Sequence, residues 1–116
     1  MTIPTNPIAY TELHTSDPAR ARAFYSELLG WNAQEEKTPM GPYWMFQGIL
    51  AGLTENRDGV PTGWLPYVTV PDVAAATKRV KQLGGQVLRD NISIPEGTFS
   101  VLRDPTGGIL GLWQKK

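Results

Sequence analysis

Glu12 and His14 are the residues whose types and spacing best suit chemistry. They lie two residues apart in the alternating segment Ile8–His14, so on a strand both side chains share one face with Tyr10. A carboxylate on a mostly apolar face is costly unless it is paired or hydrogen-bonded, and such a setting suits acid or base work. Glu12 is therefore a candidate catalytic or ligand-binding residue. The alternative is a carboxylate satisfied by a backbone N–H, by Tyr10 or by an arginine.

A metal site on Glu12 and His14 is a second possibility, because a strand presents two ligands at positions i and i+2. The chain has one histidine and no cysteine, and no third ligand can be assigned. We therefore expect no native metal and no other cofactor, and we expect His14 to be an ordinary residue at the end of a strand. Glycine-rich phosphate loops and Gly-x-Ser-x-Gly elbows are absent from the sequence.

The next segment predicts the helix that positions this strand. Asp17 is suited to cap the first turn, Pro18 to occupy the first helical position, and Gly30 to end the helix in the left-handed conformation. An apolar stripe at helical spacing is expected to pack on a sheet. Its members are Ala21, Phe24, Tyr25 and Leu28.

Four further elements are predicted before the middle of the chain. They are a short strand at Ala33–Glu36, a loop at Lys37–Pro42, a hairpin of Tyr43–Gln47 and Ile49–Leu53 around Gly48, and a linker at Glu55–Gly63.

The second half repeats the order of the first. Asp72 and Gly85 lie 55 residues after Asp17 and Gly30, as cap and stop of a second helix. The strands predicted around that helix are Tyr67–Val70, Gln86–Arg89, Thr98–Arg103 and Gly108–Gln114, with a turn at Asp104–Gly107.

This repeat predicts an α+β fold of two βαβββ modules in one domain of 116 residues. The modules span about residues 7–57 and 64–114. We expect a curved, mixed, mostly antiparallel sheet with the helices on its outer face and a concave cleft for a small molecule.

The composition argues against several partners. Lys plus Arg equals Asp plus Glu at 11 each, and the basic residues form no cluster beyond Lys115 and Lys116. We therefore expect no nucleic acid and no anionic membrane as partner. The first ten residues lack a basic region followed by an apolar run, and no segment reaches about 18 apolar residues. The absence of cysteine suits a reducing cytosol, and we expect a cytoplasmic protein.

The chain resembles the vicinal oxygen chelate superfamily, which includes glyoxalase I, extradiol dioxygenases, methylmalonyl-CoA epimerase and the bleomycin and fosfomycin resistance proteins. It is most similar to the glyoxalase-like group, with a helix ending in Gly-Trp and a second module opening with Trp-x-Pro-Tyr. The residues that carry the likeness are Asp17 with Phe24-Tyr25 and Leu29-Gly30-Trp31, Asp72 with Leu83-Gly84-Gly85, and Asp104-Pro105 with Gly107.

The resemblance implies a divalent metal held by His and Glu on four strands. The corresponding positions fall on Tyr10, Ala51, Pro66 and Gly111. Proline, alanine and glycine offer no side-chain donor, and neutral tyrosine is a poor one. Shifting this alignment by one residue places no metal ligand on the last strand of either module. Shifting it by two residues on the first strand reaches only Glu12. We therefore expect a metal-free member.

The small residues at these positions suggest room for a ligand. If Ala51 and Gly111 face inward, two-residue alternation turns Trp113 inward as well. Trp113, Tyr10 and Trp44 would then supply flat walls for an aromatic or planar molecule, although the facing of Trp44 is undetermined. The alternative is that these side chains only pack in the core or in a dimer interface.

Two functional classes follow from the resemblance. The first is a metal-free module that binds a small apolar or aromatic molecule, as the bleomycin resistance proteins do. The second is a lyase, isomerase or dioxygenase relative that uses Glu12 as acid or base, or an unrecognised metal set. A vestigial cleft is a third option. Single-domain members commonly pair, so a homodimer is expected in each case.

Overall fold

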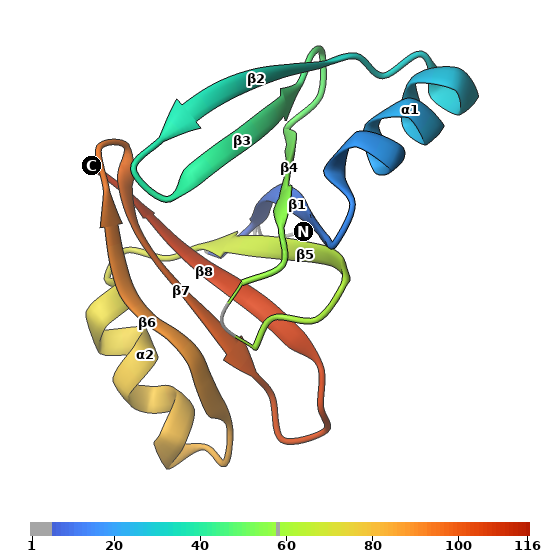
Figure 1. Cartoon of the computed structure of the whole chain (residues 1–116). Helices are drawn as coiled ribbons and strands as arrows, with labels where there is room; N and C mark the ends of the chain where they lie inside the picture. The colour runs from blue at the N-terminus through green and yellow to red at the C-terminus, as the bar shows by residue number, and fades with distance from the viewer. Residues whose placement is uncertain (1–5, 58) are drawn as a thin grey trace, which may run out of the picture. The chain divides into compact units, whose positions relative to one another are not determined.

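The computed structural model describes residues 6–57 and 59–116 (Figure 1). It divides into two compact units, which are described separately. The N-terminal unit is Thr11–Trp64, and the C-terminal unit joins the described residues up to Tyr10 with Leu65–Lys116. None of the helices within these described stretches is long and apolar enough to cross a membrane.

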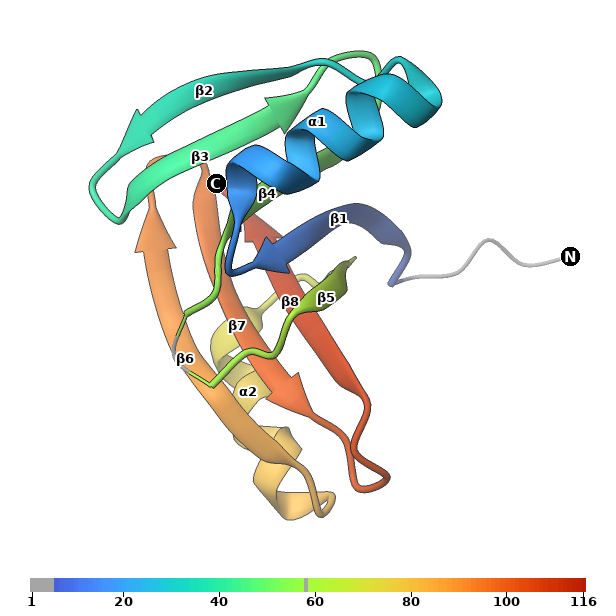
Figure 2. The ribbon, with the colours of Figure 1, turned by 45° about the vertical axis from the view of Figure 1, so that its right-hand side comes forward.

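The N-terminal unit contains one helix and the strands around it. Its strands follow the order β2-β3-β4-β1, with β1 parallel to β4 and the other pairs antiparallel. The helix α1 crosses in front of β4 in Figure 2, and its Ala21 and Tyr25 pack on the core of the unit. The elements are β1 (Ile8–Thr15, whose first three residues belong to the C-terminal unit), α1 (Pro18–Leu29), β2 (Ala33–Thr38), β3 (Gly41–Phe46) and β4 (Ala51–Glu55).

The C-terminal unit repeats this arrangement. Its strands follow the order β5-β8-β7-β6, with β5 parallel to β8 and the other pairs antiparallel. The helix α2 packs against β6, β7 and β8. The elements are β5 (Gly63–Thr69, whose first two residues belong to the N-terminal unit), α2 (Val73–Gln82), β6 (Gln86–Ile94), β7 (Gly97–Arg103) and β8 (Ile109–Lys115). The predicted α+β class, with strand, helix and three strands occurring twice, is confirmed.

The capping residues identified in the sequence predicted the positions of both helices correctly. Asp17 Oδ1 accepts a hydrogen bond from Arg20 N at 3.1 Å, and Asp72 Oδ1 accepts one from Ala75 N at 3.0 Å. Gly30 ends α1 with φ +71°, a conformation that costs glycine little.

Four expectations need correction. Phe24 and Leu28 of the predicted stripe are 57% and 62% exposed, because α1 turns Pro18, Ala21 and Tyr25 toward the protein instead. The predicted loop Lys37–Pro42 shrinks to a two-residue turn, since β2 and β3 extend into it. The β3–β4 connection spans residues 47–50 rather than Gly48 alone, and β6 continues to Ile94.

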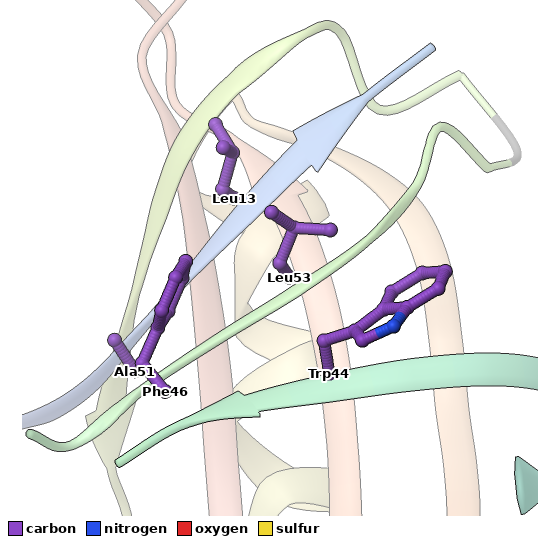
Figure 3. Packing of buried hydrophobic residues seen from close by; sticks show 5 residues of the cluster. All are labelled: Leu13, Trp44, Phe46, Ala51 and Leu53. Carbon is purple, nitrogen blue, oxygen red and sulfur yellow. The ribbon is translucent and has the colours of Figure 1, made fainter. Parts of the chain in front are cut away.

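Each unit has a buried core. In the N-terminal unit, β1, β3 and β4 contribute the cluster shown in Figure 3. Its members are Leu13, Trp44, Phe46, Ala51 and Leu53. In the C-terminal unit, a buried hydrogen bond of 2.8 Å joins Thr77 on α2 to Ser100 on β7. This bond identifies the face of the C-terminal strands that α2 covers.

Candidate ligand-binding site

Glu12 and His14 leave β1 on the face opposite to α1. Leu13, which lies between them, belongs to the core that packs on α1, so alternation turns its two neighbours the other way. Tyr43 likewise precedes the core residue Trp44 and turns to the side of Glu12. These three polar side chains therefore meet on one face of the N-terminal unit.

Glu12 forms hydrogen bonds with both of these polar neighbours, His14 and Tyr43. His14 Nε2 lies 2.7 Å from Glu12 Oε1, and the Tyr43 hydroxyl donates to Glu12 Oε2, also at 2.7 Å. The histidine is 1% exposed and the glutamate side chain 13% exposed. Each carboxylate oxygen thus accepts a hydrogen bond in a largely dry setting, where such bonds are strong.

This arrangement selects among the alternatives for Glu12. The carboxylate is hydrogen-bonded, as the alternative expects, and His14 and Tyr43 are among its partners. His14 lies near the end of β1, as expected, and it is buried and bonded to Glu12. Tyr43 was not predicted, since the pairing that brings it to Glu12 joins residues 31 positions apart.

The second ring nitrogen of His14 is buried without a hydrogen-bond partner in the described part of the chain. In a neutral imidazole, donation of the Nε2 hydrogen to Glu12 leaves a lone pair on Nδ1. The trio therefore places a potential proton acceptor at His14 and makes Glu12 the residue that orients it.

Two of the positions assigned from the resemblance face the helices. Strand register pairs Thr11 with Ala51, and Ala51 packs in the core beside α1, as Trp44 does. Gly52, which pairs with Glu12, takes the opposite face. In the C-terminal unit, Tyr67 rather than Pro66 lies beside Gly111. The prediction that Ala51 and Pro66 face the cleft is therefore wrong. The register differs from the expected one by one residue, and such a shift turns a strand side chain to the opposite face of the sheet.

The space expected above Gly111 is filled. A Cβ atom at Gly111 would lie 2.3 Å from Cδ1 of Tyr67, so the tyrosine ring rests on the glycine backbone. This ring contacts Phe99 at a centroid distance of 6.0 Å and Tyr10 at 6.3 Å. Trp113 shares this face by alternation and lies against Gly97 in the same way. The Arg89 guanidinium lies 5.1 Å from the Phe99 ring.

The C-terminal unit therefore presents what we call the aromatic face, on the side opposite to α2. It consists of Tyr10, Tyr67, Phe99 and Trp113. Tyr67 and Phe99 are buried, whereas Tyr10 and Trp113 are half-buried. The predicted residues Tyr10 and Trp113 belong to this face.

The side chains do not fit the divalent metal that the resemblance implies. Among residues 6–57 and 59–116, no group of three His, Cys, Asp or Glu side chains is placed to hold an ion. Glu12 and His14 are hydrogen-bonded to each other through Nε2, so one ion could take both as ligands only by replacing this bond. Of the four expected positions, Ala51 and Pro66 face the helices and Gly111 is covered by Tyr67.

Asp104 has a lowered pKa but lies outside these residues, in the turn before β8. The Thr106 hydroxyl, with the backbone N–H groups of Thr106 and Gly108, stabilises the carboxylate and lowers its pKa. Oδ1 accepts from all three at 2.7–3.0 Å. This is the network of a tight turn, as predicted for Asp104–Gly107.

Comparison with known proteins gives a consistent picture. A family model described as a glyoxalase-like domain matches residues 10–110. The "Putative glyoxylase CFP32" of Mycobacterium tuberculosis is 33% identical over 90% of this chain and 44% of its own length. The "Anthracycline biosynthesis protein DnrV" of Streptomyces peucetius is 28% identical over 92% of the chain and 46% of its length. The chain thus spans less than half the length of these curated relatives.

Solved structures agree at the level of the fold. A methylmalonyl-CoA epimerase from Streptomyces coelicolor superposes with a TM-score of 0.63 at 16% identity, covering 94% of both chains. A 2,2',3-trihydroxybiphenyl 1,2-dioxygenase from Sphingomonas wittichii gives 0.61 at 16% identity, covering 92% of this chain and 41% of the dioxygenase. At such identity the likeness shows the fold alone.

Proposed function

Since the chain belongs to the glyoxalase-like domain family of the vicinal oxygen chelate superfamily, we propose that it binds a small, planar aromatic molecule without a protein-bound metal ion. The observation that carries the proposal is the aromatic face of the C-terminal unit. Buried Tyr67 and Phe99 form a rigid platform, and half-buried Tyr10 and Trp113 keep part of their rings available. Aromatic rings favour offset or edge contacts with a flat ligand.

Two further observations support this ligand class. The donor set does not fit a metal ion, so recognition falls to shape and aromatic contact. The relative DnrV is named as an anthracycline biosynthesis protein, and anthracyclines are polycyclic aromatic compounds.

Titration with alizarin red S, a water-soluble sulfonated dihydroxyanthraquinone, tests the proposal by its absorbance change. We expect saturable binding that EDTA does not alter. Trp113→Ala should weaken binding about tenfold, as expected for loss of a large aromatic contact. Phe24→Ala removes an exposed aromatic ring from α1 and should leave binding unchanged. Absence of saturation at millimolar alizarin red S, or equal effects of the two variants, would overturn the proposal.

The Glu12–His14 pair favours a second candidate function, proton transfer on a bound molecule. His14 Nδ1 is buried, so an O–H or C–H group of the ligand would have to reach it inside the protein. Nδ1 would then accept the proton, and the electron pair would stay on the ligand. Glu12 would stabilise the resulting imidazolium. This assigns the acid–base role to His14 and makes Glu12 a positioning residue, because both of its oxygens are engaged.

The single histidine makes this candidate directly testable by nitrogen-15 NMR. We expect the imidazole in the Nε2–H form in the wild type, and a mixture of tautomers in Glu12→Ala. Tyr43→Phe should keep the wild-type tautomer, since Tyr43 bonds the other carboxylate oxygen. A wild-type signal from an Nδ1–H imidazole would contradict the assignment.

We also propose that two copies of the chain associate. The outer side of α1 exposes Phe24, Leu28 and Leu29 at 50% or more. Neighbouring exposed apolar residues of this size are typical of interaction surfaces.

A further inference from the structure

A hollow of about 300 Å³ lies beside α1, on residues that the proposed function does not use. We call it the α1 hollow. Arg22 and Ser26 of α1 line one side, Trp31 and Asn32 line the other, and alanine side chains keep it open. All of these residues belong to the N-terminal unit.

Arg22 brings a positive charge to the hollow. Its guanidinium lies over the Trp44 ring, 4.8 Å from the centroid, and its Nε atom is buried with no hydrogen-bond acceptor among the residues that the structure describes. No carboxylate within the described residues forms an ion pair with it. Arg22 is half-buried, and a charge that is partly removed from water gains from an oppositely charged partner, so the side chain is suited to bind an anion.

Trp44 contacts Arg22 but does not itself line the hollow, and it carries a second buried N–H group. It is 7% exposed, and its indole Nε1 is also buried without a partner among the described residues. Arg22 and Trp44 are in contact through the cation–π interaction, so two buried N–H donors without acceptors belong to one pair of side chains. Buried donors in native proteins nearly always have a partner.

The polar side chains at the rim of the hollow also present hydrogen-bond donors. The Ser26 hydroxyl donates to Asn32 Oδ1 at 3.2 Å, which occupies the amide oxygen. The amide nitrogen of Asn32 keeps its two N–H donors. Arg22 and Asn32 therefore offer hydrogen to an incoming group, while Trp31 and the alanines offer an apolar wall.

We propose that the α1 hollow binds a small carboxylate with a flat apolar body. The two coplanar oxygens of a carboxylate match the fork of an arginine, and one negative charge balances the single cation. The volume is at the lower end of small-molecule sites, which suits a ligand of about the size of benzoate. This site is separate from the aromatic face, because no residue is shared between them.

Benzoate is the probe, followed by NMR through the Arg22 Nε–H signal of the full chain. Saturable benzoate binding should move this signal, whereas the neutral isostere benzamide should leave it in place. The signal should still respond in Trp113→Ala, which separates this site from the proposed aromatic face. No saturable shift with benzoate, or an equal shift with benzamide, would overturn the proposal.

Variants supply the second readout, in which benzoate affinity is measured by calorimetry. Arg22→Gln should weaken affinity at least tenfold, and Arg22→Lys should weaken it less, because the charge stays but the fork is lost. Ala23→Leu places a larger side chain in the hollow from an exposed helix position. It should abolish binding although Arg22 itself is unchanged. Arg20→Gln, on the same helix but outside the lining, is the matched control.

Three outcomes contradict the assignment. Equal loss in Arg20→Gln would show a general charge effect. Unchanged affinity in both Arg22→Gln and Ala23→Leu would place benzoate elsewhere. Inorganic phosphate binding as tightly as benzoate would indicate an adventitious ion only.

Discussion

His14 is the buried partner of Glu12, with its Nε2 atom 2.7 Å from the carboxylate oxygen Oε1. The other oxygen accepts from Tyr43, so one carboxylate joins β1 to β3 on the face opposite to α1. A metal ion could use Glu12 and His14 together only by replacing this bond.

Glu12→Ala should destabilise the protein by about 2–3 kcal/mol. It leaves the His14 Nε2 hydrogen and the Tyr43 hydroxyl without their acceptor in a largely buried place. Chemical denaturation measures the loss, and Glu27→Ala at an exposed position of α1 should change stability by less than about 0.5 kcal/mol. Tyr43→Phe removes one donor only and should cost about 1 kcal/mol. A cost for Glu12→Ala no larger than for Glu27→Ala would contradict the network.

Gly111→Ala should destabilise the protein by about 1–3 kcal/mol through overpacking. The new Cβ would meet Cδ1 of Tyr67 at 2.3 Å, so the ring must move. Tyr67→Ala creates a cavity by itself, but adding Gly111→Ala to it should cost almost nothing further. A double-mutant cycle by denaturation measures this coupling, and additive costs would show that the ring does not cover the glycine.

Asp104 should contribute to the acid sensitivity of the protein. Hydrogen bonds from Thr106 and Gly108 lower its folded-state pKa below the ordinary 3.8, so its contribution is full above pH 3.8 and is lost as pH falls through the folded pKa. NMR titration should give an Asp104 midpoint below 3.8, which Thr106→Ala should raise, because the hydroxyl bond is the largest cause. A wild-type midpoint at or above 3.8 would count against the turn network.

Leu28→Lys should shift the chain toward monomer in sedimentation at micromolar concentration. The residue is 62% exposed on α1, where a charge would oppose association of two copies. Leu83→Lys is the matched control, since Leu83 is 63% exposed at the end of α2. A monomeric wild type, or equal behaviour of the two variants, would remove α1 from the proposed interface.

Local chemistry made much of the fold predictable. Asp17, Pro18 and Gly30 set the limits of α1 through contacts within a few residues, and Asp72 does the same at the start of α2. The 55-residue repeat of cap and stop then indicated two similar modules. The side of α1 that packs was less predictable, because Phe24 and Tyr25 are equally apolar in sequence and only Tyr25 is turned to the core.

The candidate site depended on strand register, which the sequence does not encode locally. A shift of one residue turned Ala51 and Pro66 to the helix side and brought Tyr67 beside Gly111. The pairing of Glu12 with His14 was accessible from their i, i+2 spacing, whereas the approach of Tyr43 required the order β3-β4-β1.

The ring of Tyr67 also constrains how this chain could be redesigned as a metalloenzyme. A glutamate introduced at position 111 would collide with that ring before its oxygens reached any ion. Shortening position 67 has to come first, and it opens a void in the apolar interior that only the new ligand and its metal would refill. Neither substitution is favourable alone, so a stepwise mutational route to metal binding at this strand pair begins with a loss of stability.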